Sequence, residues 1–154
     1  MASGLVGAEV TTLEIRAAPV RLRDWQTRLS DLVRRRLHTP FRWGEQDCCL
    51  WAADVVLACT GVDLAADLRG EYSTEFGARR VLAQHGGVVE LAIARLGPVV
   101  PTILAQPGDV GLVMGGEWPT LAAAAGGHFL APGPAGLVTV LPDRVARVWR
   151  CTRG

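Results

Sequence analysis

The stretch 40–56, PFRWGEQDCCLWAADVV, constrains the fold of this chain more than any other segment. A loop with aromatic residues and a glycine leads into Asp47, followed by two cysteines and an apolar run with helical spacing. Aspartate is a preferred helix N-cap, because its carboxylate accepts a hydrogen bond from a free N–H of the first turn. Cys48 then lies in that turn, where the helix dipole lowers the pKa of a thiol. The stretch therefore predicts a helix that presents Cys48 as a candidate nucleophile.

The length and composition limit the classes of protein to which the chain can belong. The chain has 154 residues, enough for one domain with a core, and combines 49% hydrophobic residues with a net charge of +1. This balance gives no electrostatic reason to expect nucleic acid or an anionic membrane as a partner. No apolar run approaches the roughly 20 residues that cross a bilayer. Residues 1–10 lack the basic and apolar regions of a secretory signal, so we expect no signal peptide and synthesis in the cytoplasm.

The four cysteines favour neither disulfides nor metal. Cytoplasmic synthesis predicts reduced thiols, and adjacent Cys48 and Cys49 are poor disulfide partners for each other. The spacing contains no paired C-x-x-C element, so no zinc site is expected, and no cofactor is implied. Cys49, Cys59 and Cys151 are expected to be core residues, as free cysteines usually are.

The first half of the chain predicts helices. Residues 1–21 are interpreted as an N-terminal arm or leader, in which the alternating segment 10–16 is an added strand, a docking arm or a loosely attached leader. A single domain is predicted over 22–154. Apolar spacing and stop signals predict helices over 24–36, 48–60, 74–85 and 88–96, with a loop over 62–72. The arginines of the first helix form either a basic patch or a solvated face.

The second half of the chain predicts a sheet. The turn Pro107-Gly108-Asp109, in which Gly108 and Asp109 are assigned structural roles, precedes a short apolar run. Strands are predicted over 110–113, 121–125, 129–130, 136–141 and 145–151. Helices followed by a sheet give an α+β fold, with the N-terminal helices packed on a small C-terminal antiparallel sheet.

Motifs distributed over residues 22–150 carry a family resemblance. They are Arg42-Trp43-Gly44-Glu45-x-Asp47-Cys48-Cys49-Leu50, Gly61-Val62-Asp63, Tyr72, His85-Gly86-Gly87, Pro107-Gly108-Asp109, Gly136-Leu137 and Val148-Trp149. The loop, the Asp-Cys helix start and the Pro-Gly-Asp turn resemble those of NlpC-type papain-like cysteine peptidases. The complete set resembles a compact phage branch of that fold, whose genes lie among the tail genes of siphophages and gene transfer agents.

The resemblance assigns roles to individual residues. It implies that Cys48 is the nucleophile, with Asp47 as helix N-cap and Gly44 as a structural residue of the loop. The family's base is a histidine that opens the strand after the Gly-Asp strand. Here that strand begins around Thr120-Leu121 and has no histidine. His128, at the start of the returning strand, is the candidate for a displaced base.

Aromatic residues of the motif have two interpretations. Trp43 and Trp51 either line a substrate groove or pack the Cys48 helix against the sheet. Phe41 stands where active relatives often have tyrosine, which removes a polar hydroxyl from the vicinity of the nucleophile.

The resemblance implies two functions of different classes. The first is a tail-tip component that has lost the catalytic base and serves as a structural adaptor, bound to hub or fibre-type tail proteins. The second is an active cysteine peptidase that cleaves peptide cross-links of peptidoglycan during DNA delivery. Both imply a location in the tail of a virion or particle.

Overall fold

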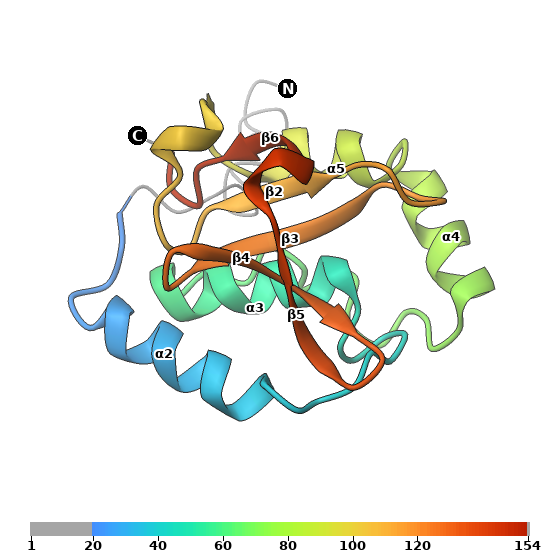
Figure 1. Ribbon diagram of the computed structural model, residues 1–154. Coiled ribbons are helices and arrows are strands. Elements are labelled where there is room, and N and C mark those ends of the chain that lie inside the picture. Colours follow the sequence, from blue (N-terminus) through green and yellow to red (C-terminus); the bar gives the residue numbers. More distant parts are fainter. Residues whose placement is uncertain (1–19, 154) are drawn as a thin grey trace, which may run out of the picture.

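The computed structural model describes residues 20–153, in which helices precede a single sheet (Figure 1). The α-helices of this part of the chain are α2 (Trp25–Arg36), α3 (Cys48–Thr60), α4 (Glu75–Gln84) and α5 (Val88–Arg95). The strands are β1 (Val99–Val100), β2 (Val110–Val113), β3 (Thr120–Ala125), β4 (His128–Gly133), β5 (Gly136–Val140) and β6 (Val145–Trp149). All neighbours are antiparallel, in the order β1-β6-β2-β3-β4-β5. Short 3-10 helices follow β1 (Thr102–Leu104) and precede β6 (Pro142–Arg144).

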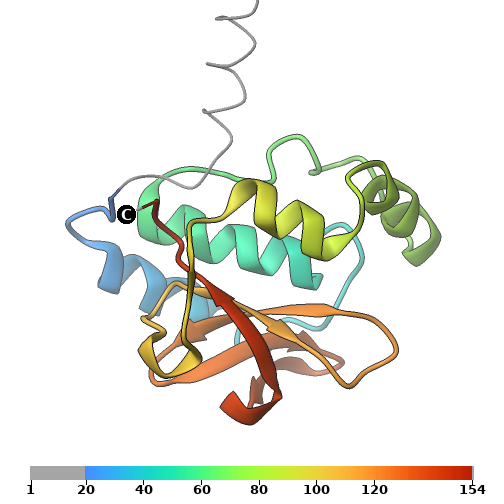
Figure 2. The ribbon, with the colours of Figure 1, turned by 90° about the horizontal axis from the view of Figure 1, so that it is seen from above.

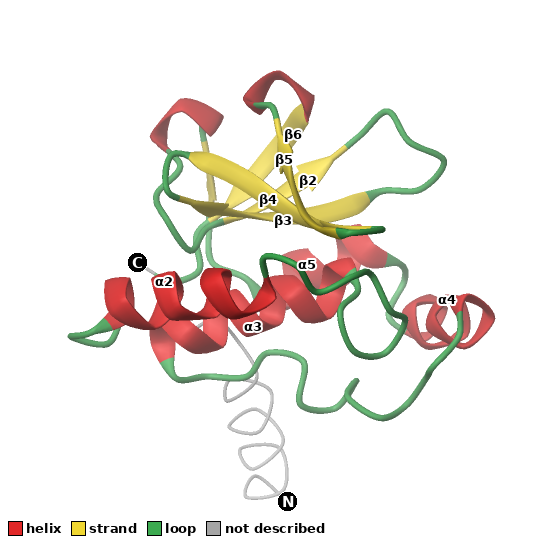
Figure 3. Ribbon diagram, turned by 60° about the horizontal axis from the view of Figure 1, so that its bottom comes forward, coloured by secondary structure: helices red, strands yellow, loops and turns green. Residues whose placement is uncertain are grey.

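Helices and strands form two layers, which Figures 2 and 3 show from two directions. Helix α3 packs directly on the sheet beside α2, and ten of its thirteen residues are buried. Its sequence explains this position, because Asp54 is the only charged residue in an otherwise apolar segment. The helix ends at Gly61, whose φ of +78° suits the left-handed C-cap conformation.

Strand β3 carries the contact between the two layers. Its side chains alternate: Leu121, Ala123 and Ala125 belong to the core shared with α3, whereas Ala122 and Ala124 belong to the core on the opposite face of the sheet. This alternation fixes which residues of β3 can approach the start of α3.

The α+β prediction is confirmed, with small differences in detail. Each predicted helix is present within one or two residues of its predicted ends. Strand β4 is longer than predicted and begins at His128, while β1 was not predicted, because two residues carry no periodicity. The predicted segment 10–16 lies outside the described residues. No helix within residues 20–153 is long and apolar enough to cross a membrane.

Gly108 and Asp109, for which structural roles are predicted, lie in the segment just before β2. Gly108 has a φ of +95°, and a Cβ there would lie 2.9 Å from the Cys59 sulfur. Asp109 is fully buried, and its carboxylate accepts hydrogen bonds from the N–H groups of Gln106 and Cys151 and from the Arg150 guanidinium. The turn is thereby tied to the C-terminal end of the domain.

Candidate functional site

The start of α3 is held by the carboxylate of Asp47, which is 1% exposed. One oxygen, Oδ1, accepts a hydrogen bond from the Leu50 N–H at 3.0 Å and caps the helix. The other, Oδ2, accepts from the Gly44 N–H at 2.9 Å and from the Tyr72 hydroxyl at 2.7 Å. One side chain therefore joins the motif loop, the first turn of α3 and the segment before α4.

Gly44 allows the loop to approach Tyr72 closely. Its φ of +81° lies in the left-handed region, and a Cβ at this position would overlap the carbonyl oxygen of Tyr72. Burial and the nearby Asp47 charge raise the pKa of the Tyr72 hydroxyl well above its ordinary value. Tyr72 therefore remains a neutral hydrogen-bond donor to Asp47 at physiological pH.

Cys48 is half-buried in the first turn of α3, and its surroundings favour the thiolate. Its pKa is lowered from the ordinary value, chiefly because the Cys49 thiol donates a hydrogen bond to it. A backbone hydrogen bond from Leu121 acts in the same direction, while burial and the charge of Asp47 act against it. The same pairing raises the pKa of Cys49 well above its ordinary value. Cys48 is thus the ionisable member of the pair.

The other cysteines are core residues. Cys59 and Cys151 are fully buried, and burial raises their pKa values to about 12 and about 11. Cys49 is 8% exposed and lines a small apolar cavity of about 50 Å³ between α3, α5 and β3.

Leu121, at the start of β3, is the residue of this strand that acts on Cys48. A hydrogen bond from its backbone lowers the pKa of the Cys48 thiol, and its side chain, 5% exposed, lies in the core cluster against which Cys48 packs. Thr120 precedes it, and alternation along the strand directs its side chain to the other face of the sheet. The first side chain of β3 on the face that packs against α3 is therefore that of Leu121, which cannot accept a proton.

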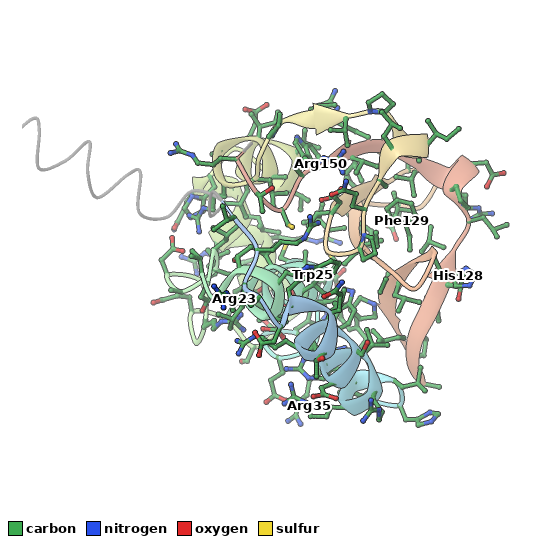
Figure 4. All side chains as sticks on the ribbon, turned by 90° about the vertical axis from the view of Figure 1, so that its left-hand side faces the viewer. Arg23, Trp25, Arg35, His128, Phe129 and Arg150 are labelled. Atoms are coloured by element: carbon green, nitrogen blue, oxygen red, sulfur yellow. The ribbon has the colours of Figure 1, made fainter. Side chains whose placement is uncertain are left out.

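The structure does not bring His128 to Cys48. His128 is exposed and pairs with Ala125, four residues beyond Leu121 along β3. At about 3.3 Å per residue, these two strand positions are about 13 Å apart. Figure 4 shows His128 at the edge of the molecule. Among residues 20–153, the groups with the largest effect on the pKa of the Cys48 thiol are Cys49, Leu121 and Asp47, and no histidine is one of them.

The groove assignment of Trp51 is wrong, because its side chain is fully buried. Its indole N–H donates to the carbonyl oxygen of Leu130 at 2.9 Å, which fixes α3 against β4. Trp43 is half-buried and packs edge-on against Phe41, with ring centroids 4.7 Å apart. Trp43 thus stabilises the loop through its contact with Phe41, and Trp51 packs α3 against the sheet.

Sequence reasoning missed the roles of Tyr72 and Leu121. Tyr72 is the only tyrosine of the chain and appeared in the motif set without a role. The interactions of Tyr72 with Asp47 and of Leu121 with Cys48 leave no local signal in the sequence, because the partners are 25 and 73 residues apart. No group of three or more histidine, cysteine or acidic residues that could hold a metal ion is found within residues 20–153.

Replacing Tyr72 with phenylalanine should raise the pKa of Cys48. The Tyr72 hydroxyl donates to Asp47 and offsets a charge that disfavours the thiolate. Removing this donor leaves that charge less compensated, so the thiol should ionise at higher pH. We expect alkylation of Cys48 by iodoacetamide to slow several-fold at neutral pH, with its pH midpoint moved upward. An unchanged or lower midpoint in a variant that stays folded would show that Tyr72 has no electrostatic effect on Cys48.

A family model matches residues 20–151 of the chain, under the description "Domain of unknown function (DUF6950)". The chain belongs to this family. The match covers nearly all of the residues that the structure describes, including the Asp47–Cys48 helix start and both layers of the fold. No curated protein matches the chain.

Proposed function

We propose that this DUF6950 domain is a compact NlpC-type papain-like module of the tail tip of a siphophage or gene transfer agent, and that it serves as a structural adaptor. The motifs around Cys48 and the α+β arrangement support the papain-like assignment. The tail setting and the hub or fibre-type partners rest on the resemblance of those motifs.

The observation that supports the adaptor role is that Leu121 opens β3 on the face that packs against α3, in the core cluster that Cys48 contacts. Amide cleavage by a cysteine needs a group that exchanges protons with the nucleophile and the departing amine. Leucine cannot do this, and the hydroxyl of Tyr72 is committed to Asp47. A thiolate without a proton donor can attack a carbonyl but cannot assist the departure of an amine.

A second candidate function, peptidoglycan cross-link cleavage, is favoured by the lowered pKa of Cys48. The free N–H groups in the first turn of α3 are also suitably placed to stabilise an oxyanion. This function requires a base from outside the described residues, such as a side chain of a neighbouring tail protein.

Incubation of the purified protein with peptidoglycan separates the two functions. We expect no release of soluble peptides above the level obtained with the Cys48→Ala variant. In the particle that carries the protein, Cys48→Ala should leave assembly and DNA delivery unchanged. If the wild-type protein releases soluble peptides and the Cys48→Ala variant does not, the protein is a peptidase and the adaptor role is contradicted.

A further inference from the structure

Positive charge is concentrated in and just before α2. Residues 20–36 contain six arginines and two aspartates, a formal charge of +4, in a chain whose net charge is +1. Residues 37–154 contain nine arginines and eleven acidic residues, a formal charge of −2. The six arginines of the first segment are Arg21, Arg23, Arg28, Arg34, Arg35 and Arg36.

Two of these arginines are partly buried and bind groups inside the fold. Arg21 donates to the Gln106 side chain and to the carbonyl oxygen of Pro107. Arg36 is paired with the buried Asp54 at 3.0 Å. Their guanidinium groups are therefore committed to internal partners.

The other four are exposed and form what we call the α2 arginine face: Arg23, Arg28, Arg34 and Arg35. Arg28 also donates through Nε to the carbonyl oxygen of Ala58 at 2.8 Å, which holds its exposed guanidinium group beside α3. Within residues 20–153, only Arg34 of this set pairs with a carboxylate, that of Asp31 at 3.4 Å, and both side chains are more than half exposed. Such exposed pairs contribute little to stability. Figure 4 shows Arg23 near the start of α2 and Arg35 near its end.

A hollow of about 620 Å³ lies between α2 and α3 beside this face. Arg28, Arg34, Arg35 and Arg36 line it, together with Asp31 and Asp54. Asp54 is already neutralised by Arg36 and by Arg69, which contacts it at 2.7 Å. The charge that the hollow presents to a partner is therefore positive.

We propose that the α2 arginine face binds an acidic segment of a protein partner. This inference rests on the proposed adaptor function and names its docking surface. A guanidinium group matches a carboxylate in two parallel hydrogen bonds, and Arg28 and Arg35, seven residues apart, lie two helical turns from each other. Asp24 and Asp31 are interleaved among the arginines. They divide the positive charge of the face into separate guanidinium groups, a spacing that suits the separate carboxylates of a peptide.

The proposal can be tested with the full chain and a fluorescently labelled glutamate-rich peptide. Fluorescence anisotropy at low ionic strength should show binding that weakens as salt is added. An Arg34→Gln/Arg35→Gln variant should bind about fivefold more weakly, as expected for the loss of two exposed ion pairs. The control variant Arg144→Gln/Arg147→Gln removes the same charge from exposed positions around β6 and should bind as the wild type does.

Three results would overturn this assignment: no binding at low salt, equal weakening in both variants, or tighter binding to a single-stranded oligonucleotide or to anionic vesicles. None of them bears on the peptidoglycan experiment. Failure of the docking surface can therefore be distinguished from failure of the adaptor function.

Discussion

Replacing Asp47 with alanine is expected to lower the free energy of unfolding by about 3 kcal/mol, because it removes a helix cap and leaves buried donors without an acceptor. The donors are the N–H groups of Leu50 and Gly44 and the hydroxyl of Tyr72. Asp47 is 1% exposed, so water cannot readily replace the carboxylate. Urea unfolding of the wild-type and variant proteins measures this difference.

Asp47→Asn is the matched control for this prediction. The amide keeps one oxygen acceptor and the size of the side chain, so it can retain the cap while losing part of the bonding at Oδ2. We expect its loss of stability to lie between those of the wild type and Asp47→Ala. A loss of less than about 1 kcal/mol in Asp47→Ala would mean that the motif loop and α3 are held together by other contacts.

The start of α3 could be predicted from sequence because its determinants are local. A capping residue, an apolar run and a terminal glycine all lie within residues 47–61. The same is true of Thr74, whose side chain accepts a hydrogen bond from the Gly77 N–H at the start of α4. Such signals arise from hydrogen bonds between residues two to four positions apart, which a single sequence displays directly.

The surroundings of Cys48 could not be predicted in the same way. The sequence placed the opening of β3 near Thr120-Leu121 but did not show which of the two residues faces α3. The register of β3 in the sheet determines which side chain faces α3, because a shift of one residue would move every side chain of the strand to the opposite face. Trp51 illustrates the same limit, since its place in the sequence is compatible with both a groove and a packing role, and only the hydrogen bond from its indole to the Leu130 carbonyl distinguishes them.

The Leu121→His variant is expected to change the acid–base behaviour of Cys48. An imidazole at this position would lie on the α3 side of β3 and could form a thiolate–imidazolium pair with Cys48. The cavity lined by Cys49 and Leu121 provides some space for the ring. Thr120→His is the matched control, because its side chain is directed to the opposite face of the sheet.

The pH dependence of Cys48 alkylation in these two variants tests the central claim most directly, namely that Leu121 stands where a base would have to be. With iodoacetamide, and with Cys48→Ala as the blank, Leu121→His should stay reactive at lower pH than the wild type. Thr120→His should follow the wild-type profile. The claim is contradicted if Thr120→His extends the reactivity and a folded Leu121→His does not, or if the wild-type profile already shows the ionisation of a histidine coupled to Cys48.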